Sequence, residues 1–251
     1  MKKALYISAL LLVSTLLHAQ SANELINEGK KLISQFKQKE ALDKFETAIV
    51  KEPNNAEALQ NASYMLSQLG EKQKDNEAKK PYFEKARDYA VKAIKLNDKD
   101  DENHFVYAVA LGRLSLIAGS EEKLKNAKLI KSEAERTIQL NPKNAGGYHI
   151  LGRLNREIAN MSAVKVMAAK AVFGGIPEGC SFDNAEKYFS KAMELRPNYI
   201  LYYYDAALNY DYMGKKSQAK TLLQKAVTLP LAVPEDPYRI NDCKNLLAKY
   251  N

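Results

Sequence analysis

The sequence contains no tryptophan and is poor in the residues on which many sites and folds depend. Its 251 residues include only 2 cysteines, 3 histidines, 11 glycines and 8 prolines. Two cysteines form at most one disulfide, which excludes a disulfide-stapled miniprotein, and so few histidines and cysteines argue against a metal-ligand cluster. Few glycines and prolines beside many Ala, Leu, Lys and Glu favour helix over strand.

A strong charge of one sign is also missing. The 38 Lys and Arg residues against 30 Asp and Glu give a net charge of +8, and the basic residues are spread along the chain. Such a mild excess is typical of a solvated surface, so we expect no nucleic-acid partner. Hydrophobic residues make up 46% of the chain, which is enough for a continuous core and argues against an intrinsically disordered protein.

The only long apolar run lies at the N-terminus. It extends from Ala4 to Leu17 behind Lys2 and Lys3, and the small Ala19 follows. The run is shorter than the about 20 residues that cross a bilayer. This pattern predicts a signal peptide over residues 1–19, with an uncleaved anchor as the less favoured alternative. We therefore expect an exported protein, periplasmic or secreted after cleavage.

Residues 22–55 carry the pattern of a 34-residue tetratricopeptide unit. Small residues stand where two antiparallel helices approach closely, and a proline ends the second helix. The residues that fit the pattern are Leu25, Gly29, Leu32, Ala41, Phe45, Ala48 and Pro53.

The same pattern recurs with altered loops in four further units. These are residues 56–100, 101–144, 145–199 and 200–233, of which the first three carry insertions of 11, 10 and 21 residues. An amphipathic helix over residues 236–250 is suited to cap the open end of the stack. The sequence thus predicts an all-α solenoid over residues 20–251, with about five tetratricopeptide-like helix pairs and a C-terminal capping helix. Because Cys180 and Cys243 fall in different layers, we expect free thiols.

The insertions suggest local structure. We expect Pro81 to be the first residue of a helix after the first insertion, and a helix to begin after Gly119 in the second. The third insertion is expected to extend the opening helix of the fourth unit through residues 161–173. A break at residues 174–177 follows, and Ser181 is suited to cap the next helix.

Several stretches are more specific than a generic repeat. They are Tyr148–Arg153, Ala171–Gly174, Ala185–Ala192, Leu229–Pro230 and Val233–Asp236. Together they resemble the regulator of microtubule dynamics family over roughly residues 75–250. The resemblance implies a helical-repeat protein without known catalytic residues. Eukaryotic members of that family are associated with membrane tethering at organelle contacts and with phospholipid binding. The resemblance therefore also implies a possible role of this kind.

No arrangement of residues in the sequence indicates catalysis. Beyond the expected signal peptide the chain has two histidines, His104 and His149, in different units. It has no Gly-rich phosphate loop and no nucleophile elbow, and its acidic residues pair with lysines at helical spacing. We therefore predict a protein that is not an enzyme and that uses no cofactor or metal.

The remaining possibility is binding, and the repeat indicates where. The first helix of each pair lines the concave face of such a stack. Positions 5 and 9 of the first unit are Ile26 and Lys30, which disfavours the Lys and Asn clamp for a C-terminal carboxylate. Candidate groove residues are Tyr64, Phe105, Val109, His149, Arg153, Arg156, Tyr204 and Leu208.

Three interpretations of this groove remain open. The insertions could fill it and make these residues core. A protein or peptide could bind there. An acyl chain could lie along its apolar part, with an anionic headgroup at Arg153 or Arg156. The leading hypothesis is a non-enzymatic exported scaffold for a protein or peptide partner; the alternative is a lipid-binding or lipid-transfer protein of the cell envelope.

Overall fold

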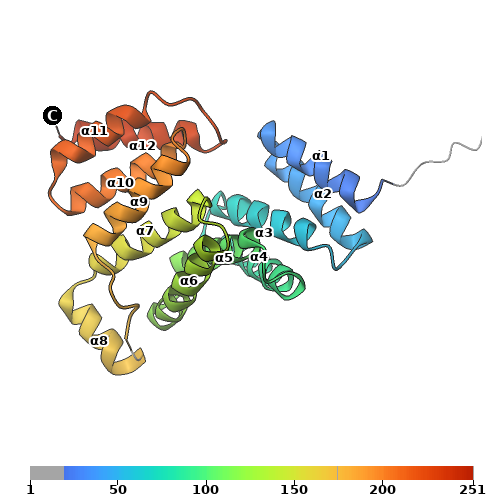
Figure 1. Ribbon diagram of the computed structural model, residues 1–251, viewed down its shortest axis with the longest axis horizontal. Helices are drawn as coiled ribbons and strands as arrows, with labels where there is room; N and C mark the ends of the chain where they lie inside the picture. The colour runs from blue at the N-terminus through green and yellow to red at the C-terminus, as the bar shows by residue number, and fades with distance from the viewer. Residues whose placement is uncertain (1–19, 174, 251) are drawn as a thin grey trace, which may run out of the picture.

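A computed structural model of the protein describes residues 20–173 and 175–250 (Figure 1). The expected signal peptide and the first glycine of the expected 174–177 break lie outside the described residues. Within them the chain forms twelve α-helices and no strand. The prediction of an all-α fold is confirmed.

The helices form five pairs, each packed on the next, and a final helix. The pairs are α1 (Ala22–Ser34) with α2 (Gln38–Lys51), α3 (Ala56–Glu71) with α4 (Asn76–Leu96), α5 (Asp101–Ile117) with α6 (Ser120–Leu140), α7 (Ala145–Ala159) with α9 (Phe182–Leu195), and α10 (Ile200–Tyr212) with α11 (Lys216–Ala226). The remaining helices are α8 (Ala163–Phe173), between α7 and α9, and α12 (Asp236–Ala248), which packs on α10 and α11. The predicted capping helix is therefore present.

A close contact between a glycine and a phenylalanine recurs in three of the pairs. The phenylalanines are fully buried, and a Cβ atom added to the glycine would lie 2.5 to 2.7 Å from a ring carbon. Only glycine therefore lets the two helices approach this closely. The contacts are Gly29 with Phe45, Gly70 with Phe83 and Gly152 with Phe189.

The expected start of the second unit's closing helix at Pro81 is wrong. Helix α4 begins earlier, at Asn76, because the Asp75 side chain accepts a hydrogen bond from the Ala78 N–H at 2.9 Å and caps the helix. Pro81 lies inside α4, where its ring is exposed and disturbs no packing. The cap, and not the proline, determines the boundary.

The expected continuation of the fourth unit's opening helix through residues 161–173 is also wrong. Helix α7 ends at Ala159, and the Asn160 N–H bonds to the Arg156 carbonyl. Asn160 and Ser162 are weak helix formers whose side chains compete for backbone hydrogen bonds. The insertion instead forms the separate helix α8, which projects from the stack (Figure 1).

Two other local predictions are confirmed. Helix α6 begins directly after Gly119, and the Ser181 hydroxyl accepts a hydrogen bond from the Asn184 N–H at 3.1 Å at the start of α9. Cys180 and Cys243 are free and belong to different apolar clusters. In the described part of the chain, no helix combines the length and apolar character needed to cross a membrane.

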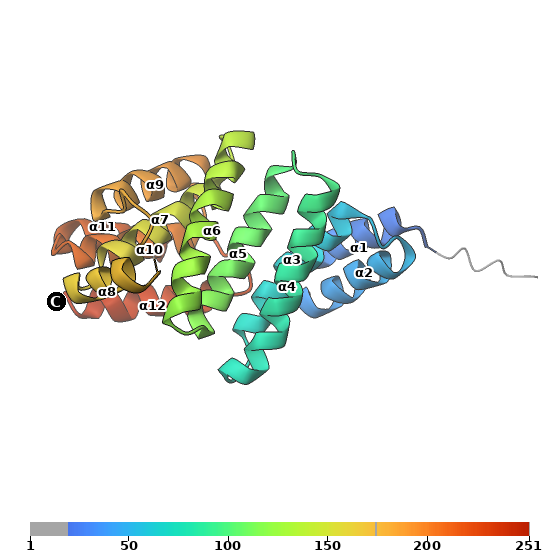
Figure 2. The ribbon, with the colours of Figure 1, turned by 90° about the horizontal axis from the view of Figure 1, so that it is seen from below.

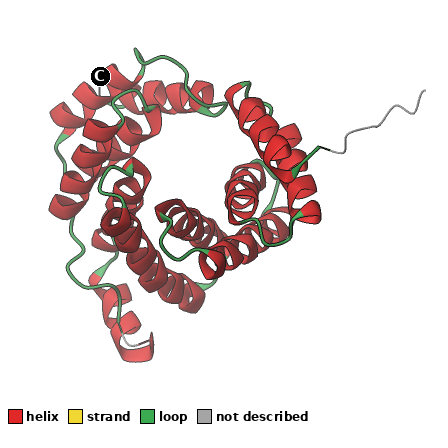
Figure 3. Cartoon of the chain, turned by 45° about the vertical axis from the view of Figure 1, so that its right-hand side comes forward, coloured by secondary structure: helices red, strands yellow, loops and turns green. Residues whose placement is uncertain are grey.

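The stack curves until its two ends meet. The pairs succeed one another along the long axis in Figure 2, and Figure 3 shows the same helices following a ring-like path. The linker between α11 and α12 closes the ring. The Glu235 carboxylate accepts a hydrogen bond from Gln38 at 3.1 Å and pairs with Lys72 at 2.9 Å. The first and last units are therefore in direct contact.

Candidate functional site

A half-open cavity of about 1210 Å³ lies inside the ring. Its walls come from α3, α5 and α7, which are the first helices of three successive pairs, and from the beginnings of α6 and α10. Two segments that belong to insertions, the start of α6 and helix α8, add to the wall. The insertions therefore extend the cavity and do not fill it.

Five of the eight predicted groove residues line this cavity. They are Tyr64, Phe105, Val109, His149 and Arg153. The Tyr64 and Phe105 rings lie 6.0 Å apart between centroids, and the Gln68 amide donates to the Tyr64 hydroxyl at 3.1 Å. Burial raises the pKa of the Tyr64 hydroxyl well above its ordinary range, so this wall is an uncharged aromatic surface.

Arg156 does not line the cavity. Its Nη1 atom donates to the Asp205 Oδ1 and carbonyl oxygens, each at 2.8 Å, and its side chain is 4% exposed. The guanidinium also lies over the Phe189 ring, 5.7 Å from the centroid. His149 Nε2 completes the cluster at 2.7 Å from Asp205 Oδ2. Arg156 therefore joins α7 to α10 as part of the core.

The charge state of this cluster follows from its surroundings. Burial by itself would raise the pKa of the Asp205 carboxyl, but Arg153, the His149 hydrogen bond and Arg156 hold that pKa well below its ordinary value. Burial, with the charges of Arg153 and Arg156, lowers the pKa of His149 although Asp205 acts to raise it. At neutral pH an uncharged His149 therefore donates its Nε2 proton to an ionised Asp205.

Arg153 lies on the same helix but faces the cavity. Its side chain is 39% exposed, and its Nε atom is 3.9 Å from Asp205 Oδ2, beyond hydrogen-bond distance. Three residues of α-helix correspond to a rotation of about 300°, so Arg153 and Arg156 point about 60° apart. Arg156 thus stabilises the fold, whereas the Arg153 guanidinium is available to a ligand.

Tyr204 and Leu208 do not line the cavity either. Both pack against the apolar cluster that contains Cys243 and Leu246 of α12. The repeat positions alone predict that this face of α10 is open to the groove. Here the capping helix covers it, so the repeat position alone did not reveal the environment of these two side chains.

Basic side chains predominate along the cavity walls. Seven are found there against two carboxylates, Glu102 and Glu157. Among the described residues, four of the seven have no ion-pair partner: Lys123, Lys143, Lys165 and Arg196. The other three are Arg113, Arg153 and Arg239.

Three arginines of the cavity wall stand outside the groove positions of the repeat and could not be predicted from them. Arg113 is one residue past a groove position, Arg196 precedes α10, and Arg239 lies in the capping helix. The Arg196 guanidinium lies 4.1 Å from the centroid of the Tyr199 ring, which also lines the cavity. The repeat pattern does not identify these arginines, because they come together only when the ring closes.

Glu102 contributes less than a full negative charge to the cavity. Desolvation by the cavity walls, followed by the charges of Asp101 and Asp100, raises the pKa of its carboxyl to about 7. The Asn144 amide donates to it at 2.9 Å. Near neutral pH this carboxyl is therefore partly protonated, and the surface around it is more basic than the residue count indicates.

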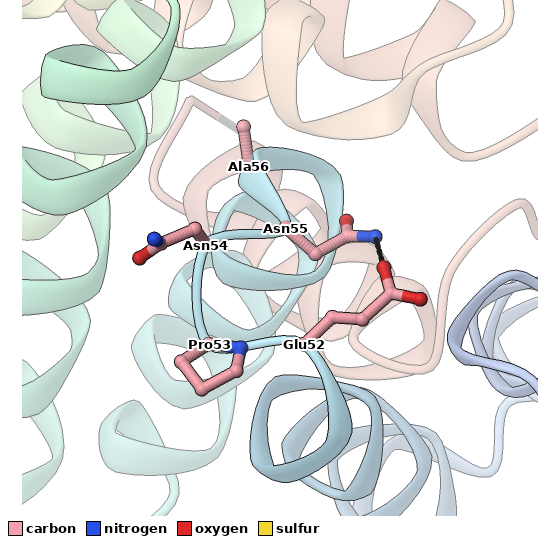
Figure 4. A pocket seen from close by; sticks show the side chains of 5 residues that line it. All are labelled: Glu52, Pro53, Asn54, Asn55 and Ala56. Atoms are coloured by element: carbon pink, nitrogen blue, oxygen red, sulfur yellow. Dashed lines mark hydrogen bonds between the residues drawn. The ribbon is translucent and has the colours of Figure 1, made fainter.

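A second hollow lies at the turn between α2 and α3 (Figure 4). Its polar side chains have structural partners: the Asn55 amide donates to Glu52 at 3.0 Å, and the Asn55 Oδ1 atom accepts from the Ala58 N–H at 3.0 Å. These bonds cap α3. The described residues also contain no group of three or more His, Cys, Asp or Glu side chains placed to hold a metal ion.

Comparison with known proteins identifies relatives over most of the chain. The model of the family described as Regulator of microtubule dynamics protein 1-3 matches residues 25–251. The chain is 30% identical over 182 residues to Regulator of microtubule dynamics protein 1 of Bos taurus. The matched region covers 70% of this chain and 55% of that protein. The chain is 28% identical over 200 residues to the Homo sapiens protein, covering 77% and 61% of the two chains.

The matched region thus spans little more than half the length of these relatives. Among solved structures, a thermophilic TPR protein of Thermus thermophilus superposes with a TM-score of 0.66 at 18% identity. The superposition covers 91% of this chain and all of that one. At this identity the likeness establishes the tetratricopeptide fold.

Proposed function

The chain belongs to the Regulator of microtubule dynamics protein 1-3 family, and from that premise we propose that it is a non-enzymatic, exported helical-repeat scaffold that binds a protein or peptide in its central cavity. The observation that carries the proposal is the cavity itself. Its volume of about 1210 Å³ exceeds the roughly 300–1,000 Å³ of sites for small molecules. Its aromatic rings and guanidinium groups are the side chains that most often anchor protein partners.

A lipid is the second candidate ligand. The wall formed by the end of α5, the start of α6 and the end of α7 contains aliphatic side chains, among them Leu116, Leu124 and Ile158. An acyl chain placed there would bring its headgroup toward Arg153. This arrangement favours an amphiphile with one anionic end.

A substitution that fills the cavity tests both candidates. Gly112 lines the cavity on α5, and a Cβ atom added there meets no atom within 4 Å. Gly112→Tyr should therefore place a ring in the ligand's space without disturbing the fold. Gly119→Tyr is the matched control, because Gly119 is exposed, does not line the cavity and has equal room for a side chain.

We expect Gly112→Tyr to abolish capture of the partner from the producing cells, and Gly119→Tyr to retain it. Circular dichroism should show unchanged helicity in both variants. Native mass spectrometry of the same proteins identifies a bound lipid by its mass. Equal capture by both variants would show that the cavity is not the binding site.

The proposed export depends on the N-terminal sequence. The apolar run before Ala19 supports cleavage there, with Gln20 as the first residue of the mature chain. N-terminal sequencing of the protein from fractionated cells tests this expectation. A chain that still begins at Met1 would contradict cleavage and favour an anchored form.

A further inference from the structure

We infer that the occupant of the cavity is an acidic peptide segment that also carries aromatic side chains. This inference rests on the proposed function and specifies the chemistry of the partner. Its first support is charge complementarity, because seven basic side chains line the walls against two carboxylates, and four of the seven have no ion-pair partner in the described part of the chain. A ligand with several negative charges lowers the mutual repulsion of these cations, whereas a basic ligand adds to it.

The basic side chains are distributed along the cavity. Lys143 lies just before α7, Arg153 lies within that helix, and Lys165 follows its end on α8. Eight residues of helix separate the start of α7 from Arg153, which is about 12 Å. A single lipid headgroup would need one concentrated cluster. Charges spaced along the wall instead match acidic side chains that recur along a peptide.

At least two of the guanidinium groups have unused hydrogen-bonding capacity. Arg153 is 39% exposed, and Asp205, the carboxylate nearest to it, already accepts hydrogen bonds from His149 and Arg156. In the described part of the chain no carboxylate lies within ion-pair distance of Arg196, whose guanidinium stacks on Tyr199. Each of these guanidinium groups can therefore bind a carboxylate of the ligand through two parallel hydrogen bonds.

The aromatic walls account for the second part of the inference. Tyr64 and Phe105, both only partly buried, present neighbouring rings on one side of the cavity. Tyr199 and Tyr202 also line it but are only 5% and 4% exposed, so they offer little ring surface to a ligand. Offset or edge-to-face contacts with the Tyr64 and Phe105 rings stabilise an aromatic side chain beyond the effect of its buried area. A peptide with acidic and aromatic residues thus complements both kinds of wall.

Selection from a random dodecamer library displayed on phage tests the inference. The purified protein is the bait, and Gly112→Tyr is the bait for counter-selection. We expect the pool enriched by the wild-type protein to have a negative mean charge and an excess of Asp, Glu, Tyr and Phe over the input library. Vesicles of phosphatidylcholine with phosphatidic acid serve as the lipid probe in a co-sedimentation assay.

The outcomes separate this inference from the proposed function. Enrichment of neutral or basic peptides that Gly112→Tyr fails to bind would overturn the acidic specificity and leave the cavity as a peptide site. No enrichment over Gly112→Tyr would overturn both, and vesicle binding blocked by Gly112→Tyr would then identify the lipid alternative as correct.

A substitution in the cavity checks the role of charge with the selected peptide. We expect Arg153→Gln to weaken its binding about tenfold, as loss of one charge-assisted contact implies, and 300 mM salt to weaken the wild-type affinity as well. Arg87→Gln is the matched control, because Arg87 pairs with Asp88 on α4, outside the cavity. Equal affinities for wild type and Arg153→Gln would contradict the proposed carboxylate contact.

Discussion

Glu235 and Lys72 form an ion pair at 2.9 Å that joins the linker before the last helix to the end of α3. Gln38, at the start of α2, donates to the same carboxylate across a separation of 197 residues. These contacts form a junction that closes the ring, although none of the three residues lines the cavity.

Removal of the Glu235 side chain should loosen the junction. We expect Glu235→Ala to speed hydrogen exchange in α1, in α2 and in residues 227–235, and to leave α5, α6 and α7 unchanged, because those helices pack within the stack. Glu178→Ala, at an exposed glutamate outside the junction, serves as the control. Unchanged exchange in Glu235→Ala would show that packing alone holds the ring closed.

The two arginines of α7 should differ in their effect on stability. Arg156→Ala leaves the buried Asp205 carboxylate without its closest cation, so we expect a loss of about 3–5 kcal/mol in the free energy of unfolding. Arg153 is partly exposed and makes no hydrogen bond to Asp205, so Arg153→Ala should cost no more than about 1 kcal/mol. Urea titrations of both variants measure the difference. Equal losses would contradict the assignment of Arg156 to the core.

The close approach of paired helices leads to a packing prediction. Ala192 is fully buried, and a Cβ atom on Gly152 would lie 2.7 Å from the Phe189 ring. Ala192→Leu and Gly152→Ala should each lower the free energy of unfolding by about 1–3 kcal/mol through overpacking. Gly112→Ala is the control, since it has room and should be neutral or stabilising. Stability equal to wild type in both overpacked variants would contradict the repeat alignment.

Acidification should destabilise the protein through His149. Burial lowers its pKa in the folded state, whereas the unfolded chain takes up a proton at the ordinary pKa of about 6.5. Below about pH 6.5 the unfolded state therefore binds more protons, and stability falls as pH decreases. We expect His149→Gln, which keeps a donor for Asp205, to reduce this slope between pH 7 and pH 5. A slope as steep in the variant as in wild type would contradict the account of this cluster.

The repeat made most of the fold predictable, because small and apolar residues at fixed spacing report the local packing of two helices. The break between α7 and α8 was not predictable, since Asn160 and Ser162 oppose helix only weakly. Ring closure could not be inferred either, because Glu235 and Lys72 meet only after every pair has added its rotation. The groove prediction therefore identified Arg153 from its helix but missed Arg196 and Arg239, which reach the cavity from the end of the fourth repeat unit and from the capping helix.

Photocross-linking in the producing cells tests the central claim, that a partner occupies the cavity, most directly. The photoreactive residue p-benzoylphenylalanine replaces Phe105 in the cavity or, as a control, Val50, which is 80% exposed on α2. We predict a discrete protein adduct from the Phe105 position that disappears when Gly112→Tyr is added, and none from the Val50 position. An adduct from Val50 alone, or a Phe105 adduct that persists with Gly112→Tyr, would contradict binding in the cavity.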